Sequence, residues 1–183
     1  MSGKELMAIR FDSAGIRRLL DLGDEIATKS AITALNRSVG KARTFAVRRV
    51  SADLQIAPQK IVRKRTKIWK ASLKSARAGL GLIVRPIRTA ALAGVRQSAQ
   101  GVTATGGRSF PRAFLAHGYG GYLMVFRRRT KERYPIYEKG VSDFEIRNEA
   151  DKDMKAALEY GMTQVEGFMA HELAWRMGAT RRK

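Results

Sequence analysis

The apolar residues of the first third of the chain recur at mainly three- and four-residue steps. This spacing is typical of one face of an α-helix and predicts an amphipathic helix over about Asp24 to Leu54. Most basic residues of the stretch fall off the apolar line, so we expect the solvent side of this helix to be positive. The apolar positions are Ile26, Ile32, Leu35, Val39, Ala42, Ala46, Val50 and Leu54.

Positive charge is concentrated in the middle of the chain. The 183 residues carry a net charge of +20, and residues 29–88 hold sixteen Lys or Arg against one acid, Asp53, which places about +15 in one third of the chain. A density of this kind favours a polyanionic partner, either nucleic acid or a strongly acidic protein surface. A surface built only for solubility usually intersperses both signs of charge.

Two clusters within the basic regions are the candidate contact sites. In the first interpretation they contact phosphates, which gives sequence-independent binding that salt weakens. In the second they contact acids on neighbouring protein subunits, and in a third they form a charged helical face without a partner. The candidate residues are Lys60, Arg63, Lys64, Arg65, Lys67 and Lys70, with Arg127, Arg128 and Arg129 as the second cluster.

The composition argues against several classes of function. The chain has no cysteine, which excludes disulfides, thiol catalysis and cysteine-based metal sites. Its two histidines, His117 and His171, lack further ligands at metal-binding spacing, and no phosphate-binding loop or nucleophile elbow is present. We therefore expect no enzyme activity, no cofactor and no metal.

No apolar run is long enough for a transmembrane helix or a signal peptide, so we expect a chain that begins near Met1 and works without secretion or a membrane.

The remaining pattern alternates between helix and strand signals. A short helix is predicted over Asp12 to Leu22, and Pro58 is well placed to open another over Gln59 to Thr66. Trp69 to Pro86 has a strand signal. The segment 89–108 has few charges and much Ala, Gly, Ser and Thr, which is consistent with a flexible loop or with weak strands.

A β-hairpin and a final helix follow. Aromatic and β-branched residues predict strands over Gly121 to Arg128 and Arg133 to Tyr137, with Pro135 requiring an edge position or a bulge. An apolar repeat predicts one long helix over about Glu145 to Met177.

The expected fold is α+β, with two long amphipathic helices packed on a small, mostly antiparallel sheet. We expect one domain over 1–183, made of helices at 12–66, a β-rich region at 67–140 and a terminal helix at 143–178.

Several short segments, taken in order, resemble the minor tail protein Z family of long-tailed bacteriophages. The likeness spans roughly residues 30 to 140, with a looser similarity in the last helix. Its motifs are Ala34-Leu35-Asn36-Arg37, Arg63-Lys64-Arg65-Thr66-Lys67, Phe110-Pro111-Arg112-Ala113-Phe114 and Arg133-Tyr134-Pro135-Ile136. The positions that carry over are Asn36, Arg37, Arg63, Lys64, Arg65, Pro111, Phe114, Tyr134 and Pro135.

This resemblance implies a structural protein that acts late in tail assembly, near the end of the tail that joins the head. The implied partners are other tail proteins (tail terminator, tail tube and neck) and the phage DNA end. Tail symmetry implies a homo-oligomeric ring, a trimer or a hexamer, located in the virion tail after assembly in the host cytoplasm. The alternative, from the charge alone, is a free sequence-independent nucleic-acid-binding module.

Overall fold

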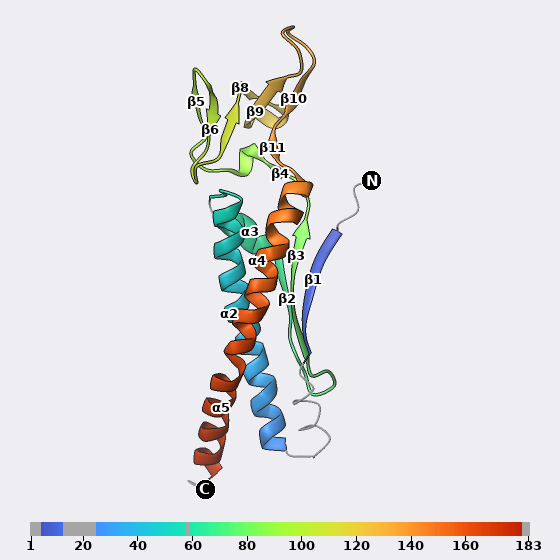
Figure 1. Ribbon diagram of the computed structural model, residues 1–183, viewed down its shortest axis with the longest axis vertical. Coiled ribbons are helices and arrows are strands. Elements are labelled where there is room, and N and C mark those ends of the chain that lie inside the picture. The colour runs from blue at the N-terminus through green and yellow to red at the C-terminus, as the bar shows by residue number, and fades with distance from the viewer. Residues whose placement is uncertain (1–4, 13–24, 58, 181–183) are drawn as a thin grey trace. The chain divides into compact units, whose positions relative to one another are not determined.

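The computed structural model describes residues 5–12, 25–57 and 59–180, and its fold is α+β (Figure 1). The described strands form four small sheets, with the orders β1-β3-β2, β10-β9-β8, β11-β4 and β5-β6-β7. None of the described helices is both long and apolar enough to cross a membrane. The elements are β1 (Glu5–Asp12), α2 (Glu25–Asp53), α3 (Lys60–Arg65), β2 (Thr66–Trp69), β3 (Arg77–Val84), β4 (Ile87–Arg88), η1 (Thr89–Ala91), β5 (Arg96–Ser98), β6 (Gly101–Thr103), β7 (Ser109–Pro111), β8 (Ala113–His117), η2 (Tyr119–Gly121), β9 (Leu123–Arg128), β10 (Ile136–Glu138), β11 (Gly140–Val141), α4 (Asp143–Thr163) and α5 (Val165–Thr180).

The chain separates into two compact units, each assembled from distant stretches. Unit 1 comprises Met1–Glu5, Val47–Arg65 and Ile83–Asp151, and unit 2 comprises Leu6–Ala46, Thr66–Leu82 and Lys152–Lys183. Both α2 and α4 contribute residues to each unit. One domain spanning the whole chain therefore stays a prediction.

The long helix predicted over Asp24 to Leu54 is confirmed as α2. Of the predicted apolar positions, Ile26 is exposed and Ile32 is half-buried, and all those from Leu35 onward are buried. The short helix predicted after Pro58 is also confirmed, as α3. The helix predicted over Asp12 to Leu22 lies outside the described residues except for Asp12, which ends β1.

The terminal helix is not continuous, so the single helix predicted over Glu145 to Met177 is wrong at its centre. It is divided into α4 and α5 at Gln164. The N–H of Gln164 donates to the carbonyl oxygen of Gly161 at 3.2 Å, which is an i→i−3 bond in place of the α-helical i→i−4 bond. The hydroxyl of Thr163 donates to the carbonyl oxygen of Tyr160 at 2.9 Å and so competes for the acceptor that the helix would use.

Segment 89–108 contains η1 and the short strands β5 and β6, which agrees with the weak-strand alternative, and the flexibility of the segment stays a prediction. β6 pairs antiparallel with both β5 and β7. Gly101 begins β6 with φ +146°, and a Cβ there would lie 2.4 Å from the carbonyl oxygen of Phe110. The tight approach of β6 and β7 therefore requires glycine at this position.

The predicted hairpin is confirmed as β9 and β10, which pair antiparallel with Tyr137 opposite Arg127. Pro135 directly precedes β10, which lies at the edge of the sheet β10-β9-β8, as expected for a residue without an N–H. On the other side of β9 lies β8, in a register that places Phe114 opposite Phe126.

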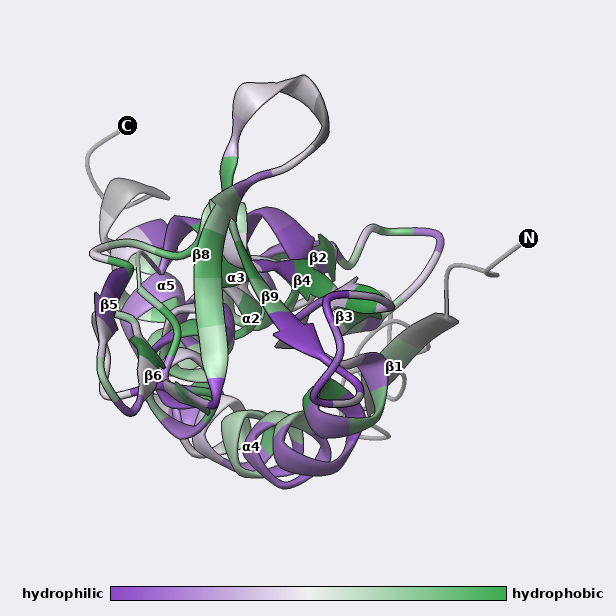
Figure 2. Cartoon of the chain, turned by 90° about the horizontal axis from the view of Figure 1, so that it is seen from above, coloured by the Kyte–Doolittle hydropathy of each residue, from purple (hydrophilic) through white to green (hydrophobic). Residues whose placement is uncertain are grey.

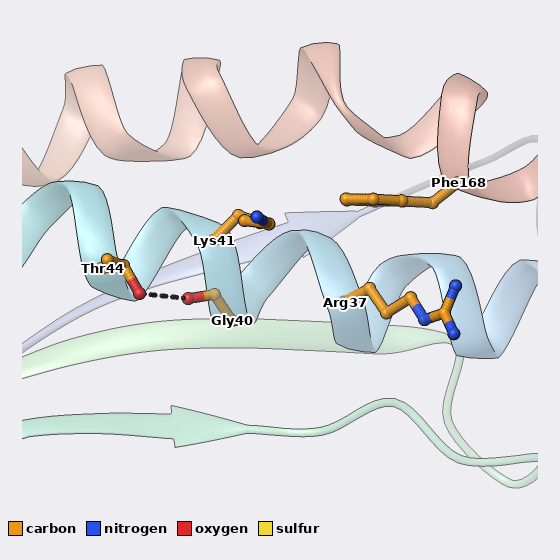
Figure 3. A pocket seen from close by; sticks show the side chains of 5 residues that line it. All are labelled: Arg37, Gly40, Lys41, Thr44 and Phe168. Atoms are coloured by element: carbon orange, nitrogen blue, oxygen red, sulfur yellow. Dashed lines mark hydrogen bonds between the residues drawn. The ribbon is translucent and has the colours of Figure 1, made fainter.

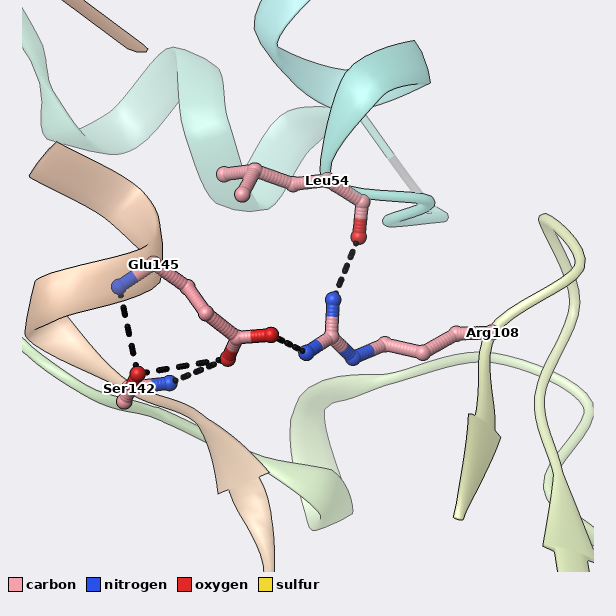
Figure 4. A network of polar contacts seen from close by, with 4 residues as sticks. All are labelled: Leu54, Arg108, Ser142 and Glu145. Atoms are coloured by element: carbon pink, nitrogen blue, oxygen red, sulfur yellow. Dashed lines mark hydrogen bonds and ion pairs between the residues drawn. The ribbon is translucent and has the colours of Figure 1, made fainter. Parts of the chain in front are cut away.

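In unit 1, the start of α4 carries a polar network that joins three separate segments (Figure 4). Ser142 and Glu145 form a capping box: the Glu145 N–H donates to the Ser142 hydroxyl at 3.2 Å, and the Ser142 N–H donates to the Glu145 carboxylate at 3.0 Å. The other carboxylate oxygen accepts from Arg108 at 2.7 Å, and Arg108 also donates to the carbonyl oxygen of Leu54 at 3.0 Å. This network ties the β6–β7 turn to the end of α2 and the first turn of α4.

In unit 2, Asn36 links α2 to the backbone that follows β2. Its amide nitrogen donates to the carbonyl oxygen of Ala71 at 3.1 Å, and its amide oxygen accepts from the Ala71 N–H at 2.8 Å. A second link within this unit is the stacking of Phe45 on Tyr160, with ring centroids 4.8 Å apart, which connects α2 to α4. These contacts supply a structural reason for the asparagine of the Asn36-Arg37 motif.

We expect the substitution Asn36→Ala to destabilise the protein by about 1–3 kcal/mol, because it removes two part-buried hydrogen bonds. Asn36→Asp keeps the acceptor but places a carboxylate oxygen against the carbonyl oxygen of Ala71, so it should destabilise the protein at least as much as Asn36→Ala. Urea denaturation measures both. Thr44→Ala, which removes an exposed side-chain bond from the same helix, is the control and should change stability by less than about 0.5 kcal/mol. Equal effects at the two positions would contradict this role of Asn36.

A pH-dependent contribution to stability is expected from Glu145. Burial by itself raises the pKa of this carboxyl, but the Ser142 N–H and the Arg108 guanidinium outweigh burial and hold the pKa below its ordinary value of 4.5. The stabilisation is therefore present above pH 4.5 and is lost as pH falls through the lowered pKa. Because the side chain is 45% exposed, we expect Glu145→Gln to destabilise by only about 1 kcal/mol at pH 7.

The measurement is denaturation of both proteins across pH. The difference between them should shrink toward zero well below pH 4.5. Glu149→Gln, on the exposed face of α4, is the control and should change stability little. A difference for Glu145→Gln that stays constant with pH would show that the charge of this carboxylate is not what stabilises the network.

Candidate functional site

A basic groove of about 640 Å³ lies in unit 1 on β8, β9 and the turn that follows β9. Five of its eight lining residues are cationic and none is acidic. In Figure 2, β9 changes from hydrophobic to hydrophilic toward its end, where this groove lies. The lining residues are Arg112, Ala113, Phe114, Arg127, Arg128, Arg129, Thr130 and Lys131, and we call them the β8–β9 groove.

Strand pairing assembles the groove from two parts of the chain. Ala113 lies opposite Arg127 in the antiparallel register of β8 and β9, which brings Arg112 to the end of the strand that carries the arginine run. The Arg128 guanidinium lies over the ring of Phe114, 5.5 Å from its centroid, so an aromatic ring contributes to the same surface. The consecutive arginines were recognisable from sequence, and Lys131, two residues further along, could have been added to them. Arg112 was missed because the β8–β9 register is a long-range property.

Arg112 adopts a backbone conformation that arginine rarely takes. Its φ is +59°, in the left-handed region, which costs an L-residue with a Cβ about 1–2 kcal/mol. The backbone holds it there through its N–H, which donates to the carbonyl oxygen of Gln100 at 3.0 Å. Glycine or asparagine would suit the turn better, so the turn alone does not explain an arginine.

The groove cations are not neutralised within the part of the chain that the structure describes. No described carboxylate forms a salt bridge with the five cations of the groove, and the Arg128 guanidinium lies over the Phe114 ring. Several like charges on one surface repel one another. An anionic partner would relieve this repulsion.

The first predicted cluster does not lie on one surface of one unit. Lys60, Arg63 and Lys64 are exposed on α3 in unit 1, whereas Lys67 and Lys70 are exposed in unit 2. The binding role of all nine predicted cations stays a prediction.

Arg65 differs from its neighbours in the same cluster. Its guanidinium donates to the carbonyl oxygens of Arg85 and Pro86, the second at 2.9 Å, and so fastens α3 to the connection between β3 and β4. Burial, assisted by the charge of Arg85, lowers the pKa of Arg65. Arg65 thus has a structural role that the sequence pattern did not reveal.

A second hollow, of about 480 Å³, lies in unit 2 between α2 and α5 (Figure 3). Arg37, Gly40, Lys41 and Thr44 of α2 line it together with Phe168 of α5. The positive charge here is partly compensated, because Arg37 forms a 2.7 Å salt bridge with Glu172, whose side chain is buried. This compensation distinguishes the hollow from the β8–β9 groove.

The described residues offer no metal site, since they contain no group of three or more His, Cys, Asp or Glu placed to hold an ion. His117, at the end of β8, has its Nδ1 3.0 Å from the carbonyl oxygen of Gly121, and His171 borders a further hollow in unit 2.

Comparison with known proteins identifies the family. No curated protein and no solved structure matches the chain. The family model described as prophage minor tail protein Z (GPZ) matches residues 11–174, which is nearly the whole chain and includes the β8–β9 groove. Members of this family are structural proteins of the phage tail. The chain therefore belongs to the prophage minor tail protein Z family.

Proposed function

We propose that this protein completes the phage tail at its head-proximal end. It forms a homo-oligomeric ring there, contacts the tail terminator, tail tube or neck, and takes part in joining the head and in positioning the DNA end. Membership of the minor tail protein Z family supports a place in the virion tail. The observation that carries the proposal further is the set of exposed cations in unit 1, on the β8–β9 groove and on α3.

Positive charge without base-specific geometry suits this position, because any DNA sequence must pass a tail. Phosphate contacts provide affinity that does not depend on sequence. The same cations would also suit an acidic rim on a neighbouring tail protein, through complementary surface potentials.

Exposed apolar residues support assembly into a ring. Trp175 and Met177 are largely exposed on α5 in unit 2. The edge strand β10 in unit 1 exposes Ile136 and Tyr137. Apolar patches and an unpaired strand edge are surfaces that heterologous, ring-forming contacts use. The subunit number of three or six follows from family resemblance.

The alternative function is a free, sequence-independent nucleic-acid-binding module. The β8–β9 groove is consistent with it too, because a surface lined by five cations and no acid suits DNA whether or not a tail partner is present. The two functions differ in their consequence for virions: only a tail-completion protein is required for joining heads to tails.

The experiment replaces Lys60, Arg63 and Lys64 with Gln in a phage that depends on this protein. Arg65 is kept, since it holds backbone carbonyls. We expect the infectious titre to fall by roughly tenfold or more, because each charge-assisted contact that the variant removes is worth about 1 kcal/mol or more. Electron microscopy should show unjoined heads and tails.

The matched control removes three exposed cations elsewhere, with the variant Lys74→Gln, Arg96→Gln and Lys152→Gln. It should retain normal titre. Normal titre and joined particles in the α3 variant would contradict the assignment of these cations to tail completion.

A further inference from the structure

We propose that the β8–β9 groove binds the sugar-phosphate backbone of nucleic acid, without reading its bases. The inference rests on the proposed function for its setting in the tail, and it assigns one ligand class to cations that otherwise suit either DNA or an acidic protein. Three features of the groove support it: its composition, the backbone of Arg112 and the ring of Phe114.

The composition of the groove matches phosphate better than it matches a protein surface. Four of its five cations are arginines, whose planar guanidinium can donate two parallel hydrogen bonds to one phosphate. Protein–protein interfaces are also enriched in arginine and aromatic residues, but their buried core is depleted of charged residues taken together. A groove lined by five cations and no acid therefore fits a continuous polyanion.

The strained backbone of Arg112 gives an independent indication of a ligand. Its left-handed φ of +59° is unfavourable for arginine, and none of the hydrogen bonds or salt bridges of the described residues involves its side chain. An arginine here therefore lowers stability in two ways, through backbone strain and through repulsion by the neighbouring cations. Strain of this kind persists where it serves a binding site.

Phe114 adds an aromatic wall to the same groove. Its ring is partly exposed, lies 6.2 Å from the ring of Phe126 and is covered on one side by Arg128. Sites that bind single-stranded nucleic acid without sequence preference combine a basic track with aromatic rings on which bases stack. The aromatic ring thus distinguishes this groove from a purely electrostatic surface.

The test compares three purified full-length proteins: the unmodified chain, a groove variant and a charge-matched control. The groove variant carries Arg112→Gln, Arg129→Gln and Lys131→Gln, and the control carries Lys74→Gln, Arg96→Gln and Lys152→Gln. Binding of a labelled DNA duplex of arbitrary sequence is followed by fluorescence anisotropy over a range of salt concentrations.

We expect the groove variant to bind the duplex about tenfold more weakly or worse. Its plot of log affinity against log salt should be shallower by about three, one for each phosphate that the variant no longer neutralises. The control should keep an affinity and a slope close to those of the unmodified chain. Equal losses of affinity in the groove variant and the control would overturn the proposal, since the binding would then follow total charge alone.

Poly-glutamate, used as a competitor, separates nucleic acid from an acidic protein partner. Poly-glutamate binding that is lost in the groove variant, with duplex binding unchanged in that variant, would mean that an acidic protein is the occupant and would overturn the proposal.

Stability provides the second readout. Arg112→Gly removes both the left-handed strain and one repelling charge, so it should raise the thermal midpoint while it weakens DNA binding. A lower midpoint would show that Arg112 has a structural role, which would contradict the proposal.

Loss of duplex binding in these variants with normal titre in phage would refute the tail-completion role and leave the groove assignment intact.

Discussion

Scarcity of acidic residues is the constraint on which this structure depends. The chain has 36 Lys or Arg and 16 Asp or Glu, so most cations cannot have a carboxylate of their own. Two of the few carboxylates connect a helix to another segment of the chain. Glu145 caps α4 and holds Arg108, and Glu172 is buried against Arg37 and Arg176. Buried or partly buried pairs are screened least by salt, so these positions use the attraction where it is strongest.

Where acids are absent, the cations remain available for a partner. The β8–β9 groove collects five of them on one surface, at a backbone position where arginine is strained. Native proteins are only marginally stable, so a feature that opposes folding indicates a gain elsewhere. In a minor tail protein, we propose that this gain is the contact of the groove with the backbone of nucleic acid.

The parts of this fold that local pattern controls were predictable from sequence. The helix α2 follows from its apolar repeat, and the β9–β10 hairpin follows from its aromatic strands and Pro135. The break at Gln164 was not predictable, because the apolar repeat continues across it while one hydrogen bond changes partner.

The same distinction applies to the candidate site. A run of arginines is visible in the sequence, but its position beside Arg112 depends on the β8–β9 register. The structural role of Arg65 depends on the carbonyl oxygens of Arg85 and Pro86, which lie about twenty residues further along the chain. The class of partner that the charge pattern predicts stays a prediction, and tertiary pairing decides which cations remain available for it.

The most direct measurement is the protection of individual arginines by DNA. Phenylglyoxal modifies exposed guanidinium groups, and mass spectrometry locates the modified residues with and without a DNA duplex. The account predicts that DNA protects Arg112, Arg127 and Arg129 and leaves Arg96, on β5, reactive. Equal reactivity of the groove arginines in the presence and absence of bound DNA would contradict the account.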